Sequence, residues 1–573
     1  MNRRTRTRRT SPRGVALLLV LGMIMTITVL ALGFIARCDT ELAVGQNMAV
    51  RMQMDQLAAS GLEHARGLLL NPQEPPSVYW TGDVRQQLDE DSGDFYDVAI
   101  DRDGSDPNDF CTYDITSTAY RERNGQRTGE SRLAATLRLD PAVALWTGAT
   151  DEDLVVRERW TIHGDVRSAR SVTNDGTIRG DVFAPGLVGD ITGAHKGVVA
   201  LTLDWPPLAS SYNHADYTTV PIGPGTISGG TYQPARIRRC NGNLILDGAV
   251  VVDGMLLVNG NVTIQGSGAR LTAAKNLAAV YVTGNLVLHQ ATDLQIEGLV
   301  VVDGDVFVGH GTDVRIVGGL FAGGRITEAT VDSSGYANGA ILRNITTWSG
   351  GGALALDGVD QYVQTPDDEA RLQLTGDYTL SARIHPAAFQ KPWAGIVAKA
   401  DPTGSANHWV LQFDDSSERR LTVCHGTHKW YAGIELAEVV GGWHHVAVVR
   451  QGNTMKSYLD GTERTAGLLY AWPGRGNGHL NIGADRTGSS SFVYKGLLDD
   501  VRVYNRALTE GEVSALPIDG SLLGHWRFDE TGDDHPDMTI AVDPLRASII
   551  DGNGANWSPA ADAFFKSVRR PQP

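Results

Sequence analysis

A long uncharged segment near the start of the chain constrains where everything after it must fold. Six arginines lie within a basic leader, residues 1–14, and the run VALLLVLGMIMTITVLALGFI follows from Val15 to Ile35 without a charge. At 1.5 Å per residue, a helix of this run is about 30 Å long, the thickness of one hydrocarbon core. Because a basic flank stays in the cytoplasm, the sequence predicts a single membrane span with all later residues exported.

The helix is expected to continue beyond the apolar run. No proline occurs between Val15 and Pro72, and the residues after Ile35 favour helix formation. We therefore expect one helix over residues 15–70, with its apolar half in lipid and its amphipathic half outside the membrane. A secretory leader would instead have a shorter apolar core and a small-residue cleavage site soon after it.

The leader and helix resemble the N-terminal segment of type IV pilin-like proteins, especially minor pilins and the K-type minor pseudopilin of type II secretion. In that family a peptidase cuts after a glycine that ends the leader, which implies cleavage between Gly14 and Val15 here. Most major pilins have Glu five residues past the cut, whereas this chain has Leu19, and the K-type tip pseudopilin also lacks that Glu. The resemblance, over about residues 1–145, favours a minor, tip-like subunit. The alternative is a plain uncleaved membrane anchor.

Residues 71–145 are predicted to form a small antiparallel β head. The proline-rich stretch 71–76 ends the helix, and residues 95–140 alternate with the period of β-strands. Asn124-Gly125 lies between two such runs and is a type I′ hairpin signal. A long helix followed by an antiparallel sheet is the arrangement expected of a pilin head.

Composition limits the class of protein and its partners. The 66 glycines and the charged fraction of 20% indicate turn-rich β structure. The net charge of −16 argues against nucleic acid as a partner and is compatible with binding of divalent cations. An exported compartment permits disulfide bonds, but the sequence does not reveal how the cysteines would pair. These cysteines are Cys38, Cys111, Cys240 and Cys424.

An imperfect repeat over residues 146–330 predicts a β-solenoid. Its unit is Gly, then Asn or Asp, then aliphatic residues, and copies spaced by 18, 24 and 20 residues begin at Gly242, Gly260, Gly284 and Gly304. Short aliphatic strands with such corners are typical of coils that stack on one another. We expect a stiff spacer, since no aromatic ladder lines the strands. The alternative is a carbohydrate groove on an exposed face.

Six segments of the C-terminal third occur in a diagnostic order. They are GGALALDGVDQYVQTP (351–366), YTLSARIHP (378–386), GIVAKAD (395–401), GGWHHVAVVRQGNTMKSYLDG (441–461), LNIGA (480–484) and KGLLDDVRVYNRALTEGEVSAL (495–516). Together they resemble a laminin-G-like, concanavalin-type jelly roll, which implies two stacked antiparallel sheets over residues 331–516. A tight turn is expected at Asp460-Gly461. The expected inner-face core is Trp443, Val446, Val448, Tyr458, Ile482 and Val501.

A strand-like segment follows the expected jelly roll, although related domains open with such a strand. It lies at residues 524–530, within the C-terminal segment 517–573, and no equivalent precedes the loop at 332–338. We expect it to complete the sandwich from the far end, because the termini of such domains lie close together. The alternative is a vestige of a second, truncated copy.

Catalytic motifs are few in this sequence. Jelly-roll glucanases need a Glu-x-Asp-x-x-Glu carboxylate cluster on one strand, and none occurs between residues 331 and 530. The metalloprotease motif HExxH and the hydrolase motif GxSxG do not occur either. The sequence therefore predicts a binding protein and not an enzyme.

Calcium is the cofactor that the jelly-roll resemblance implies. Many relatives bind it through carboxylate and carbonyl oxygens at positions that match Asp357, Asp360, Asp499 and Asp500 here. Gln361 replaces the second Asp of the usual pair, which removes one charge. The alternative is that Asp357 and Asp499 only accept hydrogen bonds from turn backbone groups.

These features together predict a mainly β protein with a transmembrane helix, a small α+β pilin-like head, a β-solenoid and an antiparallel jelly roll. We expect a single pass through the bacterial inner (cytoplasmic) membrane, with a periplasmic or extracellular bulk. The expected function is adhesion or recognition of a polysaccharide or surface glycan. The alternative is a minor component, with pilin or pseudopilin partners, of a type IV pilus or type II secretion assembly. A jelly roll alone does not identify its ligand.

Overall fold

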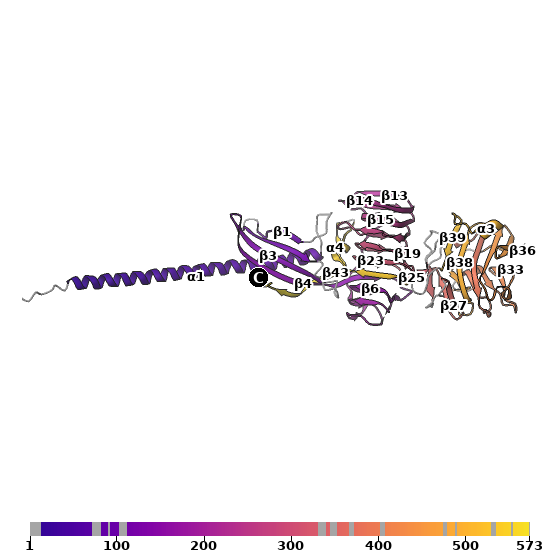
Figure 1. The fold of residues 1–573 in the computed structure, drawn as a ribbon, viewed down its shortest axis with the longest axis horizontal. Helices are drawn as coiled ribbons and strands as arrows, with labels where there is room; N and C mark the ends of the chain where they lie inside the picture. The colour runs from indigo at the N-terminus through magenta and orange to yellow at the C-terminus, as the bar shows by residue number, and fades with distance from the viewer. Residues whose placement is uncertain are drawn as a thin grey trace, which may run out of the picture.

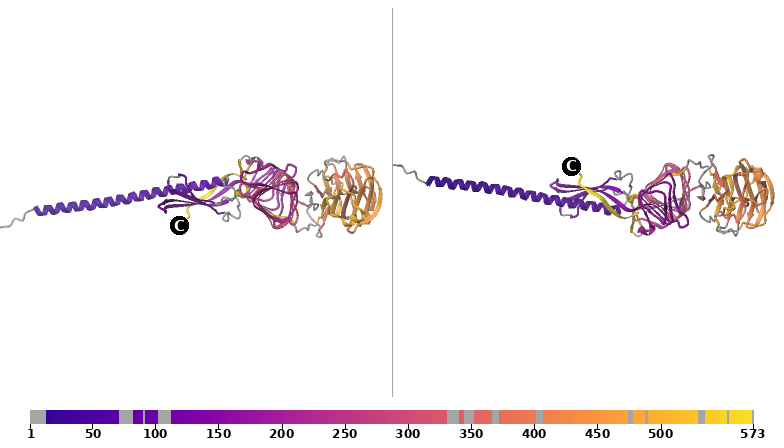
Figure 2. Two further views of the ribbon diagram at one scale, coloured as in Figure 1. Left: turned by 90° about the horizontal axis from the view of Figure 1, so that it is seen from above. Right: turned by 90° about the horizontal axis from the view of Figure 1, so that it is seen from below.

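The computed structural model is an elongated molecule whose parts lie in a row (Figures 1 and 2). Helix α1 lies at one end and the C-terminal sandwich at the other, with a small sheet and a stack of short strands between them. Residues 560–569, near the end of the chain, join the small sheet, so the chain runs the length of the molecule and returns. The structure describes residues 13–70, 82–89, 92–101, 112–330, 340–343, 352–365, 372–400, 407–473, 478–486, 490–528, 535–551 and 554–571.

Helix α1 spans Arg13–Leu70, which confirms the long continuous helix predicted from the sequence. Its 58 residues extend about 87 Å at 1.5 Å per residue. Residues 14–49 are exposed and include the whole apolar run. Within the described residues, α1 is the one helix that is long and apolar enough to cross a membrane. Its second half instead buries an apolar stripe, which includes Leu57, Ala58, Leu62 and Ala65.

The buried stripe of α1 packs on an antiparallel sheet, here called the head. Its strands, in order, are β1 (Gly82–Gln86), β2 (Asp94–Asp101), β3 (Thr112–Arg123), β4 (Gln126–Thr147) and β43 (Ala560–Arg569). The predicted β3–β4 hairpin turns at Asn124 and Gly125, whose φ angles are 53° and 72°. Gly61 permits close packing, since a Cβ atom there would lie 2.2 Å from Ser117 Oγ. The sequence-based bounds of 71–145 omit the fifth strand, β43.

The middle of the chain is a three-sided solenoid of short parallel strands. Two strands, β14 (Gly225–Asn241) and β15 (Leu244–Asn259), run around its corners. The first side also contains β16 (Val262–Ser267), β19 (Leu286–Thr292), β22 (Val306–Val308), β25 (Ile326–Thr330) and the separate sheet of β5 (Leu154–Val156), β8 (Val172–Asn174) and β11 (Leu187–Val188).

The other two sides of the solenoid are built in the same way. The second contains β17 (Arg270–Thr272), β20 (Leu294–Glu297), β23 (Asp313–Val317), β40 (Asp537–Ala541), β6 (Trp160–His163) and β9 (Thr177–Arg179). The third contains β13 (Thr219–Ile222), β18 (Val280–Val282), β21 (Val300–Val302), β24 (Leu320–Ala322), the end of β4, β7 (Asp165–Ser168), β10 (Val182–Phe183) and β12 (His195–Lys196). Aromatic residues from outside the solenoid strands, including Trp205, Tyr212 and Trp557, cover the part of this side from β14 to the end of β4, so that part is not an open groove.

The repeated Asn and Asp residues form a ladder along one corner of the solenoid. The Asn261 Oδ1 atom accepts a hydrogen bond from the backbone N–H of Asn285 at 2.9 Å, and Asn285 Oδ1 accepts one from Asp305 at 2.9 Å. Glycine precedes each ladder residue because there is no room for a Cβ atom at that position. A Cβ atom on Gly304 would lie 2.4 Å from Asn285 Oδ1. The ladder is the physical reason for the Gly-Asn/Asp repeat in the sequence.

We expect Asn285→Ala to lower the free energy of unfolding by about 1–3 kcal/mol, because the N–H of Asp305 loses its acceptor. Asn285→Asp keeps an acceptor oxygen, as Asp305 itself does in the next coil, and is the matched control. Urea denaturation of the two variants measures the difference. Equal stability of the alanine and aspartate variants would contradict the ladder as a source of stability.

One coil of the solenoid is assembled from three segments that lie far apart in the sequence. We call it the composite coil, and it consists of β25, β40 and residues 145–147 of β4. Strand β40 pairs in parallel with β23 above it and with β6 below it, so it fills a gap in the stack. The sandwich is therefore inserted into the solenoid. The C-terminal segment expected at 517–573 contributes to sandwich, solenoid and head.

Two antiparallel sheets form the C-terminal sandwich. One consists, in order, of β27 (Leu354–Asp357), β38 (Lys495–Tyr504), β29 (Tyr378–Pro386), β34 (His444–Gln451), β35 (Thr454–Leu459) and β36 (Thr462–Leu468). The other continues from β25 through β26 (Ala340–Arg343), β28 (Tyr362–Gln364), β37 (Leu480–Ile482), β30 (Gly395–Ala400), β31 (Asn407–Phe413), β32 (Arg420–His425) and β33 (His428–Glu435). The predicted turn at Asp460-Gly461 joins β35 to β36, with φ angles of 51° and 80°.

The predicted sandwich core is correct at four of its six residues, namely Val446, Val448, Ile482 and Val501. Tyr458 is buried on the opposite face of its sheet, in a cluster that includes Val513 of helix α3 (Glu510–Ala515). Trp443 is 36% exposed. It lies three residues before Val446 of β34, so the alternation of a strand directs it to the face opposite that core residue.

The strand at the far end of the domain, β39 (Leu522–Trp526), pairs antiparallel with β38 and places Trp526 opposite Val501. The same edge of β38 pairs with β27 farther along, so β27 and β39 lie end to end. Trp526 and Phe528 are buried in the sandwich core. Strand β39 therefore fills part of an edge that would otherwise expose backbone and apolar side chains.

Candidate functional site

A polar cleft of about 420 Å³ lies on the outer face of the sheet that contains β29, β38 and β39. Residues of the same strands that point the other way, such as Leu380 and Val501, belong to the sandwich core. The alternation of strand residues therefore leaves charged side chains on the outer face. The lining residues are Arg383, Asp499, Asp500, Arg502, Ile518, His525 and Arg527.

An irregularity in β38 brings two consecutive residues into the cleft. Asp500 has a φ of 50°, and the pairing of β38 with β29 shifts register at this point. In a regular strand, Asp499 and Asp500 would point to opposite faces. A bulge re-aims one of them, so both line the same cleft.

Asp500 is the centre of a charged network at the floor of the cleft. Its Oδ1 atom lies 2.6 Å from His525 Nε2 and accepts a hydrogen bond from Arg502 Nη2 at 2.9 Å. Burial alone would raise the pKa of Asp500, but the hydrogen bond from His525 and the charge of Arg502 outweigh it and lower the pKa to about 2. The cleft thus holds an ionised carboxylate with fixed neighbours.

An exposed aromatic ring lies beside the cleft. Arg383 forms an ion pair with Asp499 at 3.3 Å, and its guanidinium group lies 5.3 Å from the centre of the Trp443 ring. His385 meets the same indole edge-on, with ring centroids 5.7 Å apart. The indole ring is therefore held in one orientation next to charged hydrogen-bonding groups.

The predicted calcium ligands lie in two separate places. Asp499 and Asp500 line the cleft, whereas Asp357 ends β27 opposite Lys495, four residues along β38, or about 13 Å at 3.3 Å per residue. The Asp357 carboxylate accepts a hydrogen bond from Val359 N–H at 2.7 Å, as expected of a turn residue.

Of the described residues, none of the four aspartates (Asp357, Asp360, Asp499 and Asp500) belongs to a group of three or more side chains placed to hold a metal ion. Calcium binding by these residues stays a prediction.

The remaining predicted features concern the N-terminus and the cysteines. Gly14 and Val15 lie in the first turn of α1, and the rest of the leader lies outside the described residues. Cleavage between them stays a prediction.

The thiols of Cys38, Cys240 and Cys424 are free, and Cys111 lies outside the described residues. Burial raises the pKa of Cys424 to about 11, so this thiol is protonated at neutral pH.

Comparison with known proteins identifies the fold of the sandwich. Residues 357–514 match the family described as the concanavalin A-like lectin/glucanases superfamily. This match assigns a concanavalin A-like jelly roll to the C-terminal sandwich. A comparison of the chain with curated proteins finds no match.

Three solved structures illustrate the similarity. Domain 4 of AbnA, an extracellular arabinanase from Geobacillus stearothermophilus in complex with arabinotriose, is 20% identical, with a TM-score of 0.24 over 33% of this chain and 85% of that chain. A Trypanosoma rangeli sialidase is 20% identical, with a TM-score of 0.27 over 33% of this chain and 31% of that chain. A heptameric pentraxin from Limulus polyphemus is 22% identical, with a TM-score of 0.23 over 31% of this chain and 94% of that chain. This chain thus spans less than a third of the sialidase.

Proposed function

We propose that this protein is a membrane-anchored, exported carbohydrate-binding protein whose jelly roll recognises a polysaccharide or surface glycan for adhesion. The observation that carries the proposal is the cleft on the outer face of the jelly roll, with the ordered indole of Trp443 beside it. Its volume of about 420 Å³ lies in the range typical of ligand sites.

The chemistry of the cleft suits sugars. Hydroxyl groups of a sugar are both donors and acceptors, and they pair well with ionised carboxylates and guanidinium groups held in place. Asp500 and Arg383 supply both kinds of partner. The partly exposed indole of Trp443 offers an apolar surface for the C–H face of a sugar ring.

The arrangement of the parts suits display at a distance from a membrane. The apolar half of α1 lies at one end of the molecule and the jelly roll at the other, with the solenoid between them (Figure 1). The jelly roll would therefore project away from the bilayer on a stiff support. The location that we propose is the bacterial inner membrane, with the jelly roll in the periplasm or outside the cell.

The proposal includes binding without turnover. In affinity electrophoresis, selected polysaccharides in the gel should retain the full-length protein, which is kept in detergent micelles. The protein should release no reducing sugar from these polysaccharides. Lack of retention across neutral and acidic polysaccharides would contradict the binding function. Release of reducing sugar that one carboxylate substitution abolishes would instead make the protein an enzyme.

A second function, as a minor pilin or pseudopilin, is favoured by one specific observation. Helix α1 packs its C-terminal half on an antiparallel sheet and leaves its apolar N-terminal half exposed, as a subunit of a helical filament core requires. The exposed apolar half would then contact pilin or pseudopilin partners as well as lipid.

The two functions differ in how the N-terminus is processed. If the protein is a minor pilin or pseudopilin, the form purified from membranes should begin at Val15, since the leader ends at Gly14. N-terminal sequencing or intact mass measures the start. A retained Met1 would leave a plain anchor, and a start after Ala36 would indicate an ordinary signal peptide.

A further inference from the structure

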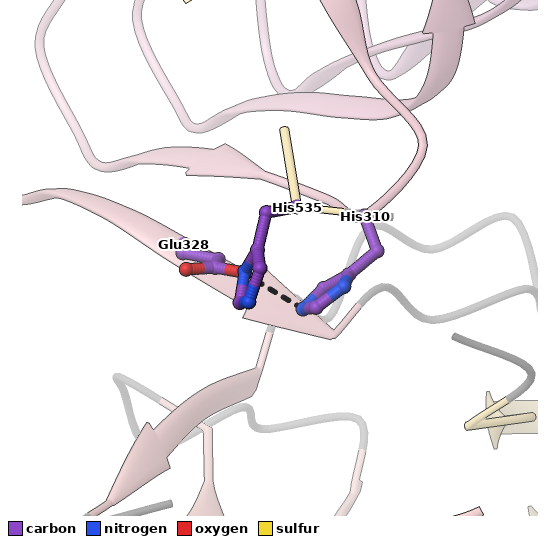
Figure 3. Close-up of side chains that lie close together, drawn as sticks. All are labelled: His310, Glu328 and His535. Atoms are coloured by element: carbon purple, nitrogen blue, oxygen red, sulfur yellow. Dashed lines mark hydrogen bonds and ion pairs between the residues drawn. The ribbon is translucent and has the colours of Figure 1, made fainter. Parts of the chain in front are cut away.

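Three polar side chains meet at one corner of the composite coil. Glu328 lies on β25, where the chain leaves the solenoid for the jelly roll, and His535 lies just before β40, where it returns. His310 lies one coil away, between β22 and β23. Figure 3 shows the three side chains pointing toward one another, although 207 residues separate Glu328 from His535.

The distances between these groups are short. His310 Nε2 lies 2.8 Å from Glu328 Oε1, and His535 Nδ1 lies 2.9 Å from the same oxygen. The ligand atoms of all three residues lie within 4.8 Å of one another. The side chains of His310 and Glu328 are 1% and 4% exposed, whereas that of His535 is 40% exposed. The cluster is therefore buried on one side and open to water on the other.

The Glu328 carboxylate also has a cationic neighbour. Arg157 Nε lies 3.2 Å from Glu328 Oε2, on the far side of the carboxylate from the two imidazoles. One carboxylate oxygen thus faces the arginine, and the other faces two aromatic nitrogen ligands.

We propose that His310, Glu328 and His535 form a site for one transition-metal ion, with zinc as the ion that suits it best. Two imidazole nitrogens and one carboxylate oxygen are ligands that zinc prefers, and water at the open side supplies a fourth. Calcium fits poorly because it takes oxygen ligands. Ligand atoms around tetrahedral zinc are about 3.3 Å apart, so the present 2.8 and 2.9 Å separations need to open by a few tenths of an ångström.

The site has a structural role in this proposal. The metal ion joins the strand that leaves the solenoid to the segment that returns from the jelly roll, and it joins both to the neighbouring coil through His310. Since the ion binds the folded state and three separate segments do not meet in the unfolded chain, it stabilises the insertion point. The proposal is independent of carbohydrate binding.

Zinc alone is the probe that tests the site. Full-length protein without a histidine tag, stripped with a chelator and kept in detergent, should bind one equivalent of Zn²⁺ in calorimetry. Its melting temperature should rise by about 5 °C or more at saturating zinc. Co²⁺ should give the visible absorption of a four-coordinate site. Absence of stoichiometric binding to the wild-type protein would overturn the proposal.

Substitutions locate the bound ion. His535→Ala removes a half-exposed ligand and should weaken zinc binding by about 100-fold or more. Substitution of a residue that only hydrogen-bonds to a metal ligand already lowers metal affinity by about 10–100-fold, so loss of a ligand should cost at least as much. Glu328→Gln should also weaken it. His444→Ala is the matched control, because His444 likewise lies 2.9 Å from a carboxylate, that of Asp460, on the jelly roll. Unchanged zinc affinity in His535→Ala, or loss in the control alone, would overturn the assignment.

Discussion

Trp526→Ala is expected to lower the free energy of unfolding of the jelly roll by about 3–5 kcal/mol. The indole of Trp526 is fully buried in the sandwich core, and it lies on the strand that closes the edge of β38. Its loss leaves a cavity and weakens the docking of β39. Thermal unfolding of the full-length protein, followed by near-ultraviolet circular dichroism, measures the effect.

The matched control for this substitution is Trp472→Ala in the same domain. Trp472 is 44% exposed, so its loss should cost about 1 kcal/mol or less. Equal unfolding temperatures for the Trp526 and Trp472 variants would mean that β39 is a vestigial segment that contributes nothing to the sandwich.

Ile540→Asp is expected to destabilise the solenoid by about 3–5 kcal/mol, because it buries an uncompensated charge. Ile540 lies on β40 in the composite coil and is fully buried, with solenoid strands on both sides. The coil would open, and the two halves of the solenoid would no longer be joined on this side. Limited proteolysis should then cut the solenoid faster than it cuts the jelly roll.

The neighbouring residue provides the control for this prediction. Thr539→Asp places the same side chain one position earlier, on a partly exposed residue of the same strand. It should leave the proteolysis pattern unchanged. If both variants resisted protease like the wild-type protein, β40 would not be needed to close the stack.

Features set by local sequence were predictable. The continuous helix follows from an apolar run without proline, and the hairpin at Asn124-Gly125 follows from residues that accept positive φ. The solenoid corners were predictable because each ladder residue bonds the backbone of the next coil, which imposes Gly-Asn/Asp at a regular spacing. In each case the residues that matter are close in the sequence.

Features that depend on distant segments were not predictable. Strand β40 is five residues long and resembles many short strands, so nothing in it indicates that it would enter a solenoid whose other strands end at residue 330. The cluster of His310, Glu328 and His535 is hidden for the same reason. The polar cleft could have been found in part, since Arg383 and His385 alternate with apolar residues of β29 and must face outward.

The sequence-based prediction for Trp443 is wrong for a local reason. The residue is a large aromatic directly before the mainly apolar, buried strand β34, which favours a core assignment. It lies an odd number of positions before Val446 and Val448 of the core, so the alternation of a strand places it on the opposite face. The indole turns outward and contacts Arg383 and His385 instead.

The most direct measurement uses a polysaccharide that retains the wild-type protein in affinity electrophoresis. Its affinity is measured for two cleft variants and for two control variants with the same types of substitution. Arg383→Ala should weaken binding by about tenfold or more, since a hydrogen bond to a charged group contributes about 1.5–3 kcal/mol. Trp443→Ala should weaken it by about the same factor, because it removes the apolar surface on which the sugar ring would pack. The exposed residues Trp472 and Arg464 of the same domain provide the controls, and their alanine variants should bind within about twofold of the wild-type protein. Full affinity in both cleft variants would contradict carbohydrate recognition by the outer face of the jelly roll.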